Sequence, residues 1–586
     1  MDNEPIQSFS NLLENPKDFD VKIKVGERPN IKEFKVHSNI LSARSKYFKV
    51  ALSSRWARRE NGIIIFNKPN ISPPVFEILL KQGKFLKALK LYEEILKNCP
   101  HSAEDQESAL QEHHVNFLNL GYNELGIIYA ESLAEDSTLK YLNISHNNLG
   151  SEGGEALADT RCKNSTLTSL NLCSNDLGAK GGKALIDALC KNSTLKDLNL
   201  SYNKFGTDGG KALADALCKN STLKDLNLSY NKFGTDGEKA LADALCSNTT
   251  LTSLNLESNE LGAKGGKALA DALCKNSTLK DLNLSYNKFG NDGGKALPDA
   301  LCRNTTLTSL NLCSNDFGSE EGKALADALC KISTLTFLNL NYNYLVSEGE
   351  KAIANALCKN FTLKDLHLRL NYIGSEGGKA LADALCKNST LTSLNLANIN
   401  IGSEEGKALA DALSKNSMLT SLNLERNDLG SEGGKAIADA ICKNSTLTSL
   451  NLANNDLGSE GGKALADALY KNVTLTSLNL ANNDLGSEGG KALTDALCMN
   501  TTLTSLDLGS NGFGYKVRKA IADANCKNSI LTSLNIAYNK LGSEGGKALA
   551  DALSKNSTLT YLNIKRTSIN FKLKSNNLNL KILQCF

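Results

Sequence analysis

The segment 458–464, GSEGGKA, has residue types that could form a phosphate-binding loop. Such a loop needs four residues between its glycines and a hydroxyl residue after the lysine, because that hydroxyl holds Mg²⁺. Here Gly458 and Gly462 enclose three residues, and Ala464 stands in place of the hydroxyl. The segment is therefore predicted to bind no nucleotide phosphate.

The histidines and cysteines show no catalytic or metal-binding spacing. None of the six histidines lies in an HExxH motif or another recognisable catalytic frame. The 16 cysteines form no CxxC or Cys/His ligand pattern. Twelve of them fall in one series of period 28, which also accepts Ser414, Tyr470 and Ser554, so the position suits packing better than ligation. We predict a non-enzymatic protein with no catalytic residue, no metal and no cofactor.

Composition and charge favour a protein partner. The formal net charge is +3 with 22% charged residues, which gives no electrostatic reason to expect nucleic acid or a membrane surface. The N-terminus carries acidic residues and no signal-peptide-like apolar run, and no stretch of about 18 apolar residues occurs in the sequence. We predict a cytoplasmic location, and interpret the many Asn-Ser-Thr triplets as by-products of a repeat and not as glycosylation sites.

A repeat of 28 residues fills most of the chain. In the copy at 475–503, Leu478 and Leu480 alternate as in a strand with one buried face, whereas Gly489 and Leu497 lie on one stripe of a helix. One strand and one helix cannot bury a core alone, so neighbouring copies must stack.

An asparagine after the second strand leucine marks seventeen units, and fifteen of them carry it. Asn483 and its equivalents are expected to be buried and to bond backbone groups that lack ladder partners. Ile399 and Thr567 are the exceptions, and we expect a local distortion near Ile399. Pro298 stands where other units have Ala in mid-helix, so that helix should kink or begin there. Ser459 is the predicted N-cap of its helix.

The pattern LxxLxLxxNxLxxxGxxxLxxxLxxxxx resembles the leucine-rich repeats of the ribonuclease-inhibitor subfamily over about four-fifths of the chain. The resemblance implies an α/β solenoid, a horseshoe with a parallel sheet inside and helices outside. The solenoid is predicted at 115–567, and residues 568–586, which abandon the period, are the predicted C-terminal cap. The repeat also resembles that of the Ran GTPase-activating protein, which implies a GTPase-activating regulator as one alternative function.

Residues 18–81 follow a tail at 1–17 and are a different kind of sequence. Their patterns predict strands at 20–25, 33–36 and 62–66 and a helix at 39–52. This order resembles a truncated BTB/POZ domain, a small α+β fold, and the match stops near Lys81. The residues that carry the resemblance are Asp20, Val21, Phe34, Lys35, Val36, His37, Ile40, Leu41, Ser45, Tyr47 and Phe48. The resemblance implies a homodimer, or recruitment of a cullin-type ubiquitin ligase.

Residues 82–114 form the predicted helical linker. Gly83, Phe85, Tyr92 and Pro100 are placed as in the second helix of a tetratricopeptide repeat, which this segment resembles. The alternative is an amphipathic linking helix. Either would cover the first edge of the solenoid.

The binding residues are expected on the concave face of the solenoid, beside the strand leucines. Tyrosines and acidic residues concentrate there between about 197 and 370, and tyrosine with charged neighbours is common in binding hot spots. The alternative is that each is an ordinary solvated strand residue. The predicted partner-binding residues are Asp197, Tyr202, Asp225, Tyr230, Glu257, Asp281, Tyr286, Phe337, Tyr342, Asp365, His367 and Arg369. We predict a scaffold that binds a protein partner on this face; the other alternative is a substrate adaptor of a cullin-type ubiquitin ligase acting through the BTB-like domain.

Overall fold

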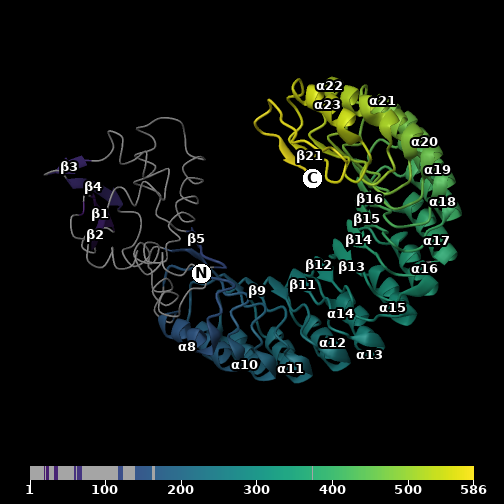
Figure 1. Ribbon diagram of the computed structural model, residues 1–586. Helices are drawn as coiled ribbons and strands as arrows, with labels where there is room; N and C mark the ends of the chain where they lie inside the picture. Colours follow the sequence, from purple (N-terminus) through teal and green to yellow (C-terminus); the bar gives the residue numbers. More distant parts are fainter. Residues whose placement is uncertain are drawn as a thin grey trace. The chain divides into compact units, whose positions relative to one another are not determined.

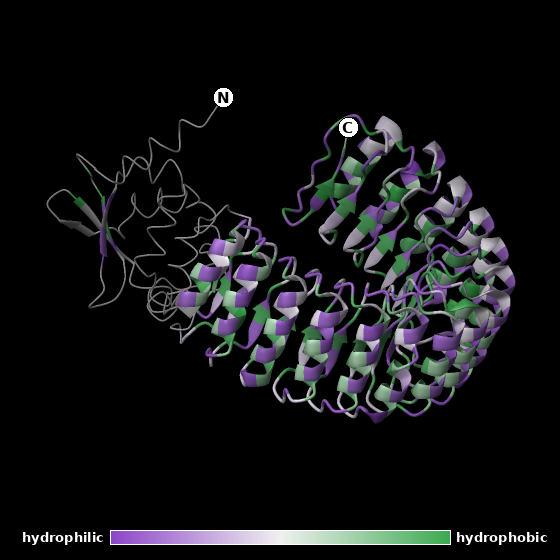
Figure 2. Cartoon of the chain, turned by 90° about the horizontal axis from the view of Figure 1, so that it is seen from below, coloured by the Kyte–Doolittle hydropathy of each residue, from purple (hydrophilic) through white to green (hydrophobic). Residues whose placement is uncertain are grey.

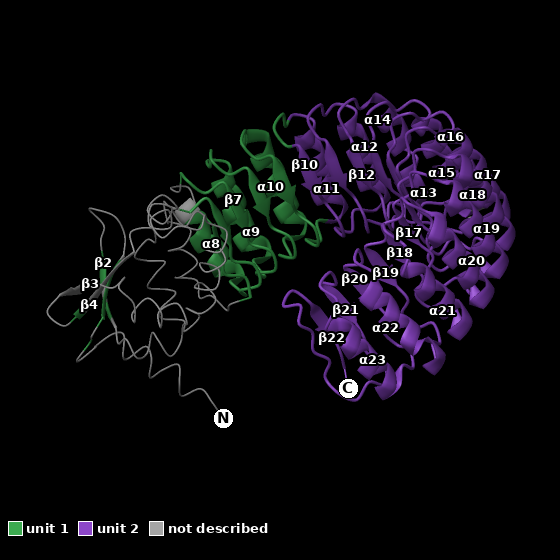
Figure 3. Cartoon of the chain, turned by 90° about the horizontal axis from the view of Figure 1, so that it is seen from above, with its two compact units in different colours: residues 1–233, 248–251 green, residues 234–247, 252–586 purple. Residues whose placement is uncertain are grey.

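The computed structural model describes residues 19, 21–25, 32–36, 58–60, 63–68, 117–122, 139–161, 165–372 and 374–585. The chain divides into two compact units (Figure 3). Unit 1 comprises residues 1–233 with 248–251, and unit 2 comprises residues 234–247 with 252–586.

Unit 1 begins with a four-stranded sheet in the order β2-β1-β4-β3. Its strands are β1 (Val21–Val25), β2 (Lys32–Val36), β3 (Arg58–Glu60) and β4 (Ile63–Lys68). β1 pairs antiparallel with β2 and parallel with β4, and β3 pairs antiparallel with β4. The three predicted strands are confirmed, whereas β3 was not predicted. The predicted helix at 39–52 and the tetratricopeptide-like segment lie outside the described residues.

The described residues of the unit 1 repeats form parallel strands and helices in alternation. The strands are β5 (Phe117–Asn119), β6 (Tyr141–Asn143), β7 (Ser169–Asn171), β8 (Asp197–Asn199) and β9 (Asp225–Asn227). The helices are α8 (Gly150–Arg161), α9 (Gly178–Leu189) and α10 (Gly206–Lys219).

Unit 2 continues the same alternation. Its strands are β10 (Ser253–Asn255), β11 (Asp281–Asn283), β12 (Ser309–Asn311), β13 (Phe337–Asn339), β14 (Asp365–His367), β15 (Ser393–Asn395), β16 (Ser421–Asn423), β17 (Ser449–Asn451), β18 (Ser477–Asn479), β19 (Ser505–Asp507), β20 (Ser533–Asn535), β21 (Tyr561–Asn563) and β22 (Lys581–Leu583). Its helices are α11 (Gly234–Leu245), α12 (Gly262–Leu273), α13 (Gly290–Gly294), α14 (Leu297–Arg303), α15 (Ser319–Leu329), α16 (Val346–Leu357), α17 (Gly374–Lys387), α18 (Ser403–Lys415), α19 (Gly430–Lys443), α20 (Gly458–Lys471), α21 (Gly486–Leu497), the 3₁₀ turn η1 (Tyr515–Val517), α22 (Arg518–Lys527) and α23 (Gly542–Leu553).

Each strand from β5 to β21 buries its middle leucine, and its two flanking residues are half-buried or exposed. β17 and β18, for example, pair in register with Leu450 opposite Leu478, and both leucines are buried. In unit 2 the helices lie along one side of the sheet and leave the other face uncovered (Figure 1). Figure 2 shows hydrophobic and hydrophilic residues side by side along these helices, so each is amphipathic. The arrangement confirms the predicted solenoid of strands and helices.

The marker asparagines form a buried ladder that joins consecutive repeats. The Nδ2 group of Asn483 donates to the carbonyl of Leu452, one repeat earlier, at 2.9 Å and to that of Leu480 at 3.0 Å. Its backbone N–H donates to Oδ1 of Asn511, one repeat later, at 3.0 Å. Each amide thus satisfies backbone groups that have no strand partner, as predicted, at about 1 kcal/mol per bond.

A second asparagine ladder, which was not predicted, runs through the Asn-Ser-Thr triplets. Asn444 is buried; its Nδ2 donates to the carbonyl of Leu413 at 2.8 Å, and its Oδ1 accepts the N–H groups of Thr446 and Leu447 at 3.0 and 2.7 Å. The asparagine of this triplet is therefore a structural residue with its side chain engaged. Ile332 takes its place in one repeat and is also buried.

Glycines let neighbouring helices approach each other. A Cβ atom added at Gly462 of α20 would lie 3.2 Å from Cα of Gly489 on α21 and 3.2 Å from Cδ2 of Leu485. Few real Cβ atoms approach a backbone so closely. The repeated glycine pair is thus explained by helix-to-helix packing within the outer layer.

Three local predictions have different outcomes. Pro298 breaks its helix as expected, since α13 ends at Gly294 and α14 starts at Leu297 with the proline in its first turn. The N-cap prediction at Ser459 is wrong: α20 already begins at Gly458, which has φ +61°, and no side chain caps it. The distortion expected near Ile399 does not affect strand pairing, because β14, β15 and β16 keep their register.

Candidate functional site

The uncovered sheet face presents three rows of side chains in each unit. The first-position row is the residue that opens each strand, and the third-position row is the residue that ends it. The turn row is the residue three positions after the strand end. Turn-row residues adopt left-handed backbone angles; in unit 2, Tyr286 has φ +58° and Asn482 has φ +55°. We call this surface the open face, and it corresponds to the predicted concave face.

In unit 1 the first-position row holds Asp197 two strands away from Tyr141. Ser169 Oγ donates to Asp197 Oδ2 at 2.8 Å, which links the first-position residues of β7 and β8. Burial, together with the negative charge of Asp197, raises the pKa of Tyr141. Tyr141 in turn stacks on Phe117, with ring centroids 4.1 Å apart. The carboxylate and the stacked rings therefore form one continuous first-position row, which also includes the exposed Asp225.

The turn row of unit 1 carries further stacked rings. Tyr202 and Tyr230 stack with centroids 4.1 Å apart, and Tyr122 and His146 stack at 4.0 Å. The first pair was predicted as binding residues, whereas the second was not. The second pair could have been predicted from the sequence, because Tyr122 and His146 occupy the same repeat position as Tyr202.

In unit 2 the predicted residues of β10 to β12 form a polar group around a buried thiol. Glu257 Oε2 accepts the Nδ2 group of Asn283 at 3.2 Å. Burial, with the nearby Cys313, raises the pKa of the Tyr286 hydroxyl, and burial with the charge of Glu257 raises the pKa of the Cys313 thiol to about 11. Such a thiol stays protonated at neutral pH, so it is unsuited to nucleophilic chemistry.

Strand β14 concentrates charge on the open face. Asp365 and His367 are the first and third residues of β14 and Arg369 follows His367 by two residues, so the alternation places all three side chains on this face. Asp365 Oδ1 lies 3.1 Å from His367 Nε2. Burial acts to raise the pKa of Asp365, but hydrogen bonds from His367 and Ser393 outweigh it, and the pKa is lowered.

Aromatic rings of the preceding repeat complete what we call the β14 cluster. The ring of Phe337 packs edge-on against His367 at 5.4 Å, and the Arg369 guanidinium lies 6.0 Å from the centre of the Tyr342 ring. Arg369 Nε is shielded from solvent and makes no hydrogen bond within the described residues. The β14 cluster, residues Phe337, Tyr342, Asp365, His367 and Arg369, thus brings five of the predicted binding residues together. Asp281 is separate and accepts a hydrogen bond from Ser309 at 3.2 Å.

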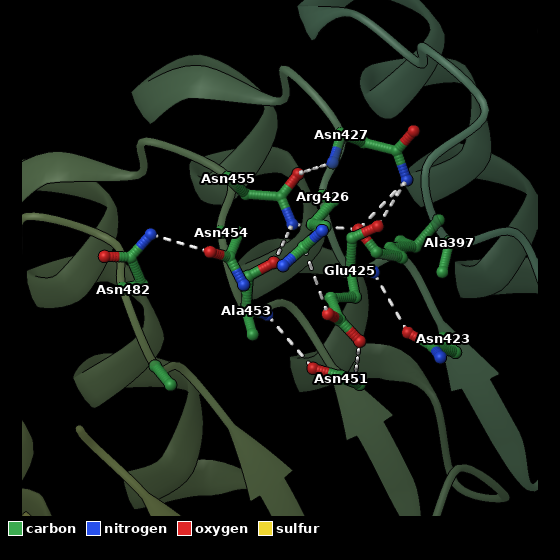
Figure 4. Close-up of polar contacts among 12 residues, drawn as sticks. Ala397, Asn423, Glu425, Arg426, Asn427, Asn451, Ala453, Asn454, Asn455 and Asn482 are labelled. Atoms are coloured by element: carbon green, nitrogen blue, oxygen red, sulfur yellow. Dashed lines mark hydrogen bonds and ion pairs between the residues drawn. The ribbon is translucent and has the colours of Figure 1, made fainter. Parts of the chain in front are cut away.

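A second charged position lies outside the predicted set. Glu425 Oε1 lies 3.6 Å from Arg426 Nε, and Glu425 Oε2 accepts the Asn451 Nδ2 group at 3.3 Å (Figure 4). Beside this pair, Asn482 donates to Asn454 Oδ1 at 2.6 Å. An acid and an arginine stand here where later repeats carry Ala and Asn, and this variation was the signal that could have identified them.

The described part of the chain contains no group of three or more His, Cys, Asp and Glu residues arranged to hold a metal ion. All the cysteines that the structure describes are free. None of the described helices combines the length and apolar character that a membrane span requires.

Family models match both parts of the chain. The Leucine Rich repeat model matches ten segments, at 135–158, 163–185, 191–214, 219–242, 247–270, 275–297, 303–326, 471–493, 500–522 and 527–550. The TMOD/LMOD Leucine-rich domain model matches residues 370–460, and the BTB/POZ domain model matches residues 9–84. The chain is a leucine-rich-repeat protein with a BTB/POZ domain near its N-terminus.

Among solved structures, this leucine-rich-repeat protein is similar to the Rad7 and Elc1 complex in yeast, with 17% identity, a TM-score of 0.40, and coverage of 68% of this chain and 86% of that chain. It is also similar to the leiomodin-1 actin-binding site 2 structure, with 22% identity, a TM-score of 0.24, and coverage of 26% and 88%. A search of curated proteins found no match.

Leucine-rich-repeat and BTB/POZ domains are typically non-catalytic interaction modules, and their presence indicates protein–protein interaction. The residue types on the open face are consistent with protein binding. Aromatic rings, an arginine and paired carboxylates on a rigid sheet are groups that anchor protein partners.

Proposed function

We propose that this protein is a cytoplasmic, non-enzymatic scaffold that binds a protein partner on the open face of its ribonuclease-inhibitor-type repeats. The observation that supports this most is the β14 cluster. Most strands of the face present Ser or Asp and Asn, whereas β14 presents Asp365, His367 and Arg369 beside the rings of Phe337 and Tyr342.

The β14 cluster has the composition and the energetic state expected of a hot spot. Trp, Tyr and Arg dominate measured hot spots because they bring large contact areas and several donors. Arg369 Nε, shielded and without a hydrogen bond within the described residues, costs free energy in the unbound protein. A partner carbonyl or carboxylate that accepts from it would recover that cost.

The chain itself supplies the replacement that tests this proposal. The next strand, β15, carries Ser393, Asn395 and Ala397 at the corresponding positions. The triple variant D365S/H367N/R369A therefore converts the β14 face to a sequence that already folds in this sheet. The exposed pair Glu376 and Lys379 of α17 lies in the same repeat on the helix side, so E376A/K379A is the matched control.

The experiment is affinity purification of the full chain from cells, with quantitative mass spectrometry of the bound proteins. We expect the triple variant to lower the recovery of specific partners by about tenfold or more, since hot-spot losses of about 2 kcal/mol are usual. The helix-side control should keep them. A partner set unchanged by the triple variant would contradict the proposal.

A substrate adaptor of a cullin-type ubiquitin ligase is the second candidate, and the BTB/POZ match at residues 9–84 favours it. A shortened BTB-like domain at 18–81, a linker at 82–114 and a solenoid at 115–567 would then place recruitment and substrate binding in different segments. Co-purification of a cullin with the full chain is the expected result. Recovery of open-face partners without any cullin would remove this candidate and leave the scaffold proposal intact.

A further inference from the structure

We propose that the open face of unit 1 binds an arginine-bearing segment of a partner protein. This inference rests on the scaffold function proposed above and makes its ligand chemistry specific. It concerns the open face of β5 to β9, whereas the preceding test concerns β14.

The open face of unit 1 carries carboxylates and no cationic Lys or Arg in its rows. The first-position row contributes Asp197 and Asp225, and both are exposed. The described residues of the three rows are Phe117, Asn119, Tyr122, Tyr141, Asn143, His146, Ser169, Asn171, Ser174, Asp197, Asn199, Tyr202, Asp225, Asn227 and Tyr230. Among these residues Asp197 and Asp225 are the carboxylates and none is Lys or Arg, so a cationic ligand meets complementary charge.

The same face presents ring surfaces in stacked pairs. Phe117 is 41% exposed, Tyr122 is 72% exposed and Tyr202 is 47% exposed. Each belongs to a pair whose ring centroids lie 4.0 to 4.1 Å apart. Stacking fixes the orientation of the rings, so a planar group can bind on them at little cost in side-chain entropy.

Carboxylate and rings together favour arginine over other cations. A guanidinium can stack on a tyrosine face while its N–H groups donate to a carboxylate, and an ammonium cannot do both with the same geometry. Asp197 provides such a carboxylate in the same row as Tyr141, since Ser169 pairs with Tyr141 on one side and with Asp197 on the other. Lys140, Lys196 and Lys224 lie one residue before the first-position row and border it.

Stacked aromatic rings also bind nucleic-acid bases, so a single strand is the competing occupant. Phosphate groups would be repelled by Asp197 and Asp225, which lie within the rows, whereas Lys140, Lys196 and Lys224 lie outside them. The charge of the face therefore favours the protein ligand.

The test uses the full chain and a fluorescein-labelled peptide with Gly-Arg-Ser repeats. The matched probe is the same peptide with citrulline in place of arginine, which keeps the shape of the side chain and removes its charge. Binding is measured by the fluorescence anisotropy of the peptide. We expect the arginine peptide to bind and its affinity to fall with added salt, and the citrulline peptide to bind at least about tenfold more weakly.

The variants are again taken from the repeats of the chain. D197S/D225S and Y202S/Y230S introduce the serine that other copies carry at these rows, at Ser169 and Ser174. Each double variant should weaken arginine-peptide binding about fivefold or more. E376A/K379A changes an exposed pair on the helix side of unit 2 and should leave it unchanged.

Equal binding of the arginine and citrulline peptides would overturn the inference, and so would full binding by D197S/D225S. A single-stranded oligonucleotide that binds the chain and binds D197S/D225S more tightly would overturn it in favour of nucleic acid. The two proposals can fail separately. If the β14 variant loses cellular partners and D197S/D225S keeps them, only the scaffold proposal is supported. If the chain binds the arginine peptide but not the citrulline peptide, and no cellular partner depends on the open face, only the ligand chemistry is supported.

Discussion

Tyrosines in the turn row hold a backbone conformation that suits smaller residues. Tyr202, Tyr230, Tyr286 and Tyr342 have φ between 55° and 58°. For a residue with a Cβ atom the left-handed region costs roughly 1 kcal/mol, and Asn tolerates it best. Later repeats carry Asn454 and Asn482 at this position. The tyrosines thus lower stability where they occur, which fits retention for binding.

We expect Y286N and Y342N to stabilise their repeats by about 0.5–1 kcal/mol each, because asparagine adopts the same φ at lower cost. Urea unfolding and hydrogen exchange of the repeat amides would measure this gain. Y344N is the control: Tyr344 is also exposed but does not have a positive φ, so no gain is expected. An equal change in all three variants would show that the φ angle is not the cause.

Two helices carry a buried glutamate at the second position of the repeated glycine pair. Residues 191–218 and 219–246 are identical except that Glu238 replaces Gly210. Glu238 of α11 and Glu350 of α16 are both 0% exposed, and their carboxyl oxygens have no hydrogen-bond partner within the described residues. Burial raises the pKa of Glu238 well above its ordinary value and that of Glu350 to about 9, with no charged neighbour contributing to either shift.

A raised carboxyl pKa makes stability fall as pH rises. The contribution is fully present below the unfolded pKa of 4.5 and is lost as pH rises toward about 9 for Glu350. We expect E350Q to become more stable than the parent chain as pH rises from 5 to 8, by about 2–4 kcal/mol. Thermal unfolding of the two chains across this range measures the difference. A difference that does not change with pH would show that Glu350 is ionised and solvated.

Glu405 at the start of α18 should behave in the opposite way. Hydrogen bonding to Ser375 lowers its pKa, and Glu405 Oε2 also accepts the N–H of Gly402 at 3.2 Å. The stability from a lowered pKa is present above the unfolded pKa of 4.5 and is lost as pH falls below it. E405Q should therefore be less stable than the parent at pH 7, and the difference should shrink in acid. The same unfolding series tests it, and a loss that persists at pH 3 would contradict the titration argument.

The sequence predicted the boundary of a helix correctly where a single residue acts on its own turn of the backbone. Pro298 broke its helix because a ring without an N–H acts on its own turn. Ser459 failed as a cap because Gly458, with a positive φ, lets the helix start one residue earlier. The burial of Glu238 could not be predicted from its own helix: it depends on α12, where a Cβ at Gly265 would collide with the Glu238 carboxyl.

At the scale of the whole chain, repetition explains why the fold was predictable and the candidate site was not. The role of Leu478 is restated in every copy, so its burial follows from the period alone. His367 is not repeated in the other copies. The sequence places its side chain on the open face but does not show which aromatic rings contact it. Its contact with Phe337 arises between strands and became apparent only in the structure.

The last repeat depends on residues that leave the period. β22 pairs with β21, and Ile564 N–H donates to the Leu583 carbonyl at 2.9 Å. Ile569 and Leu573 are buried in the same segment. A solenoid whose contacts are all between neighbours exposes a core face wherever it is cut, so these residues cover what would otherwise be an open end.

We therefore expect a chain ending at Thr567 to lose amide protection in β21 and α23 while β14 to β17 keep theirs, because coupling between repeats decays with distance. The exposed edge of β21 should also make this chain associate at high concentration. Hydrogen exchange and sedimentation measure the two effects. A chain ending at Gln584 is the control, since it keeps the bond from the Gln584 Nε2 group to the Phe571 carbonyl at 2.7 Å. Unchanged protection after truncation at Thr567 would mean that the final repeat is stable without this segment, and the predicted cap would then have no structural role.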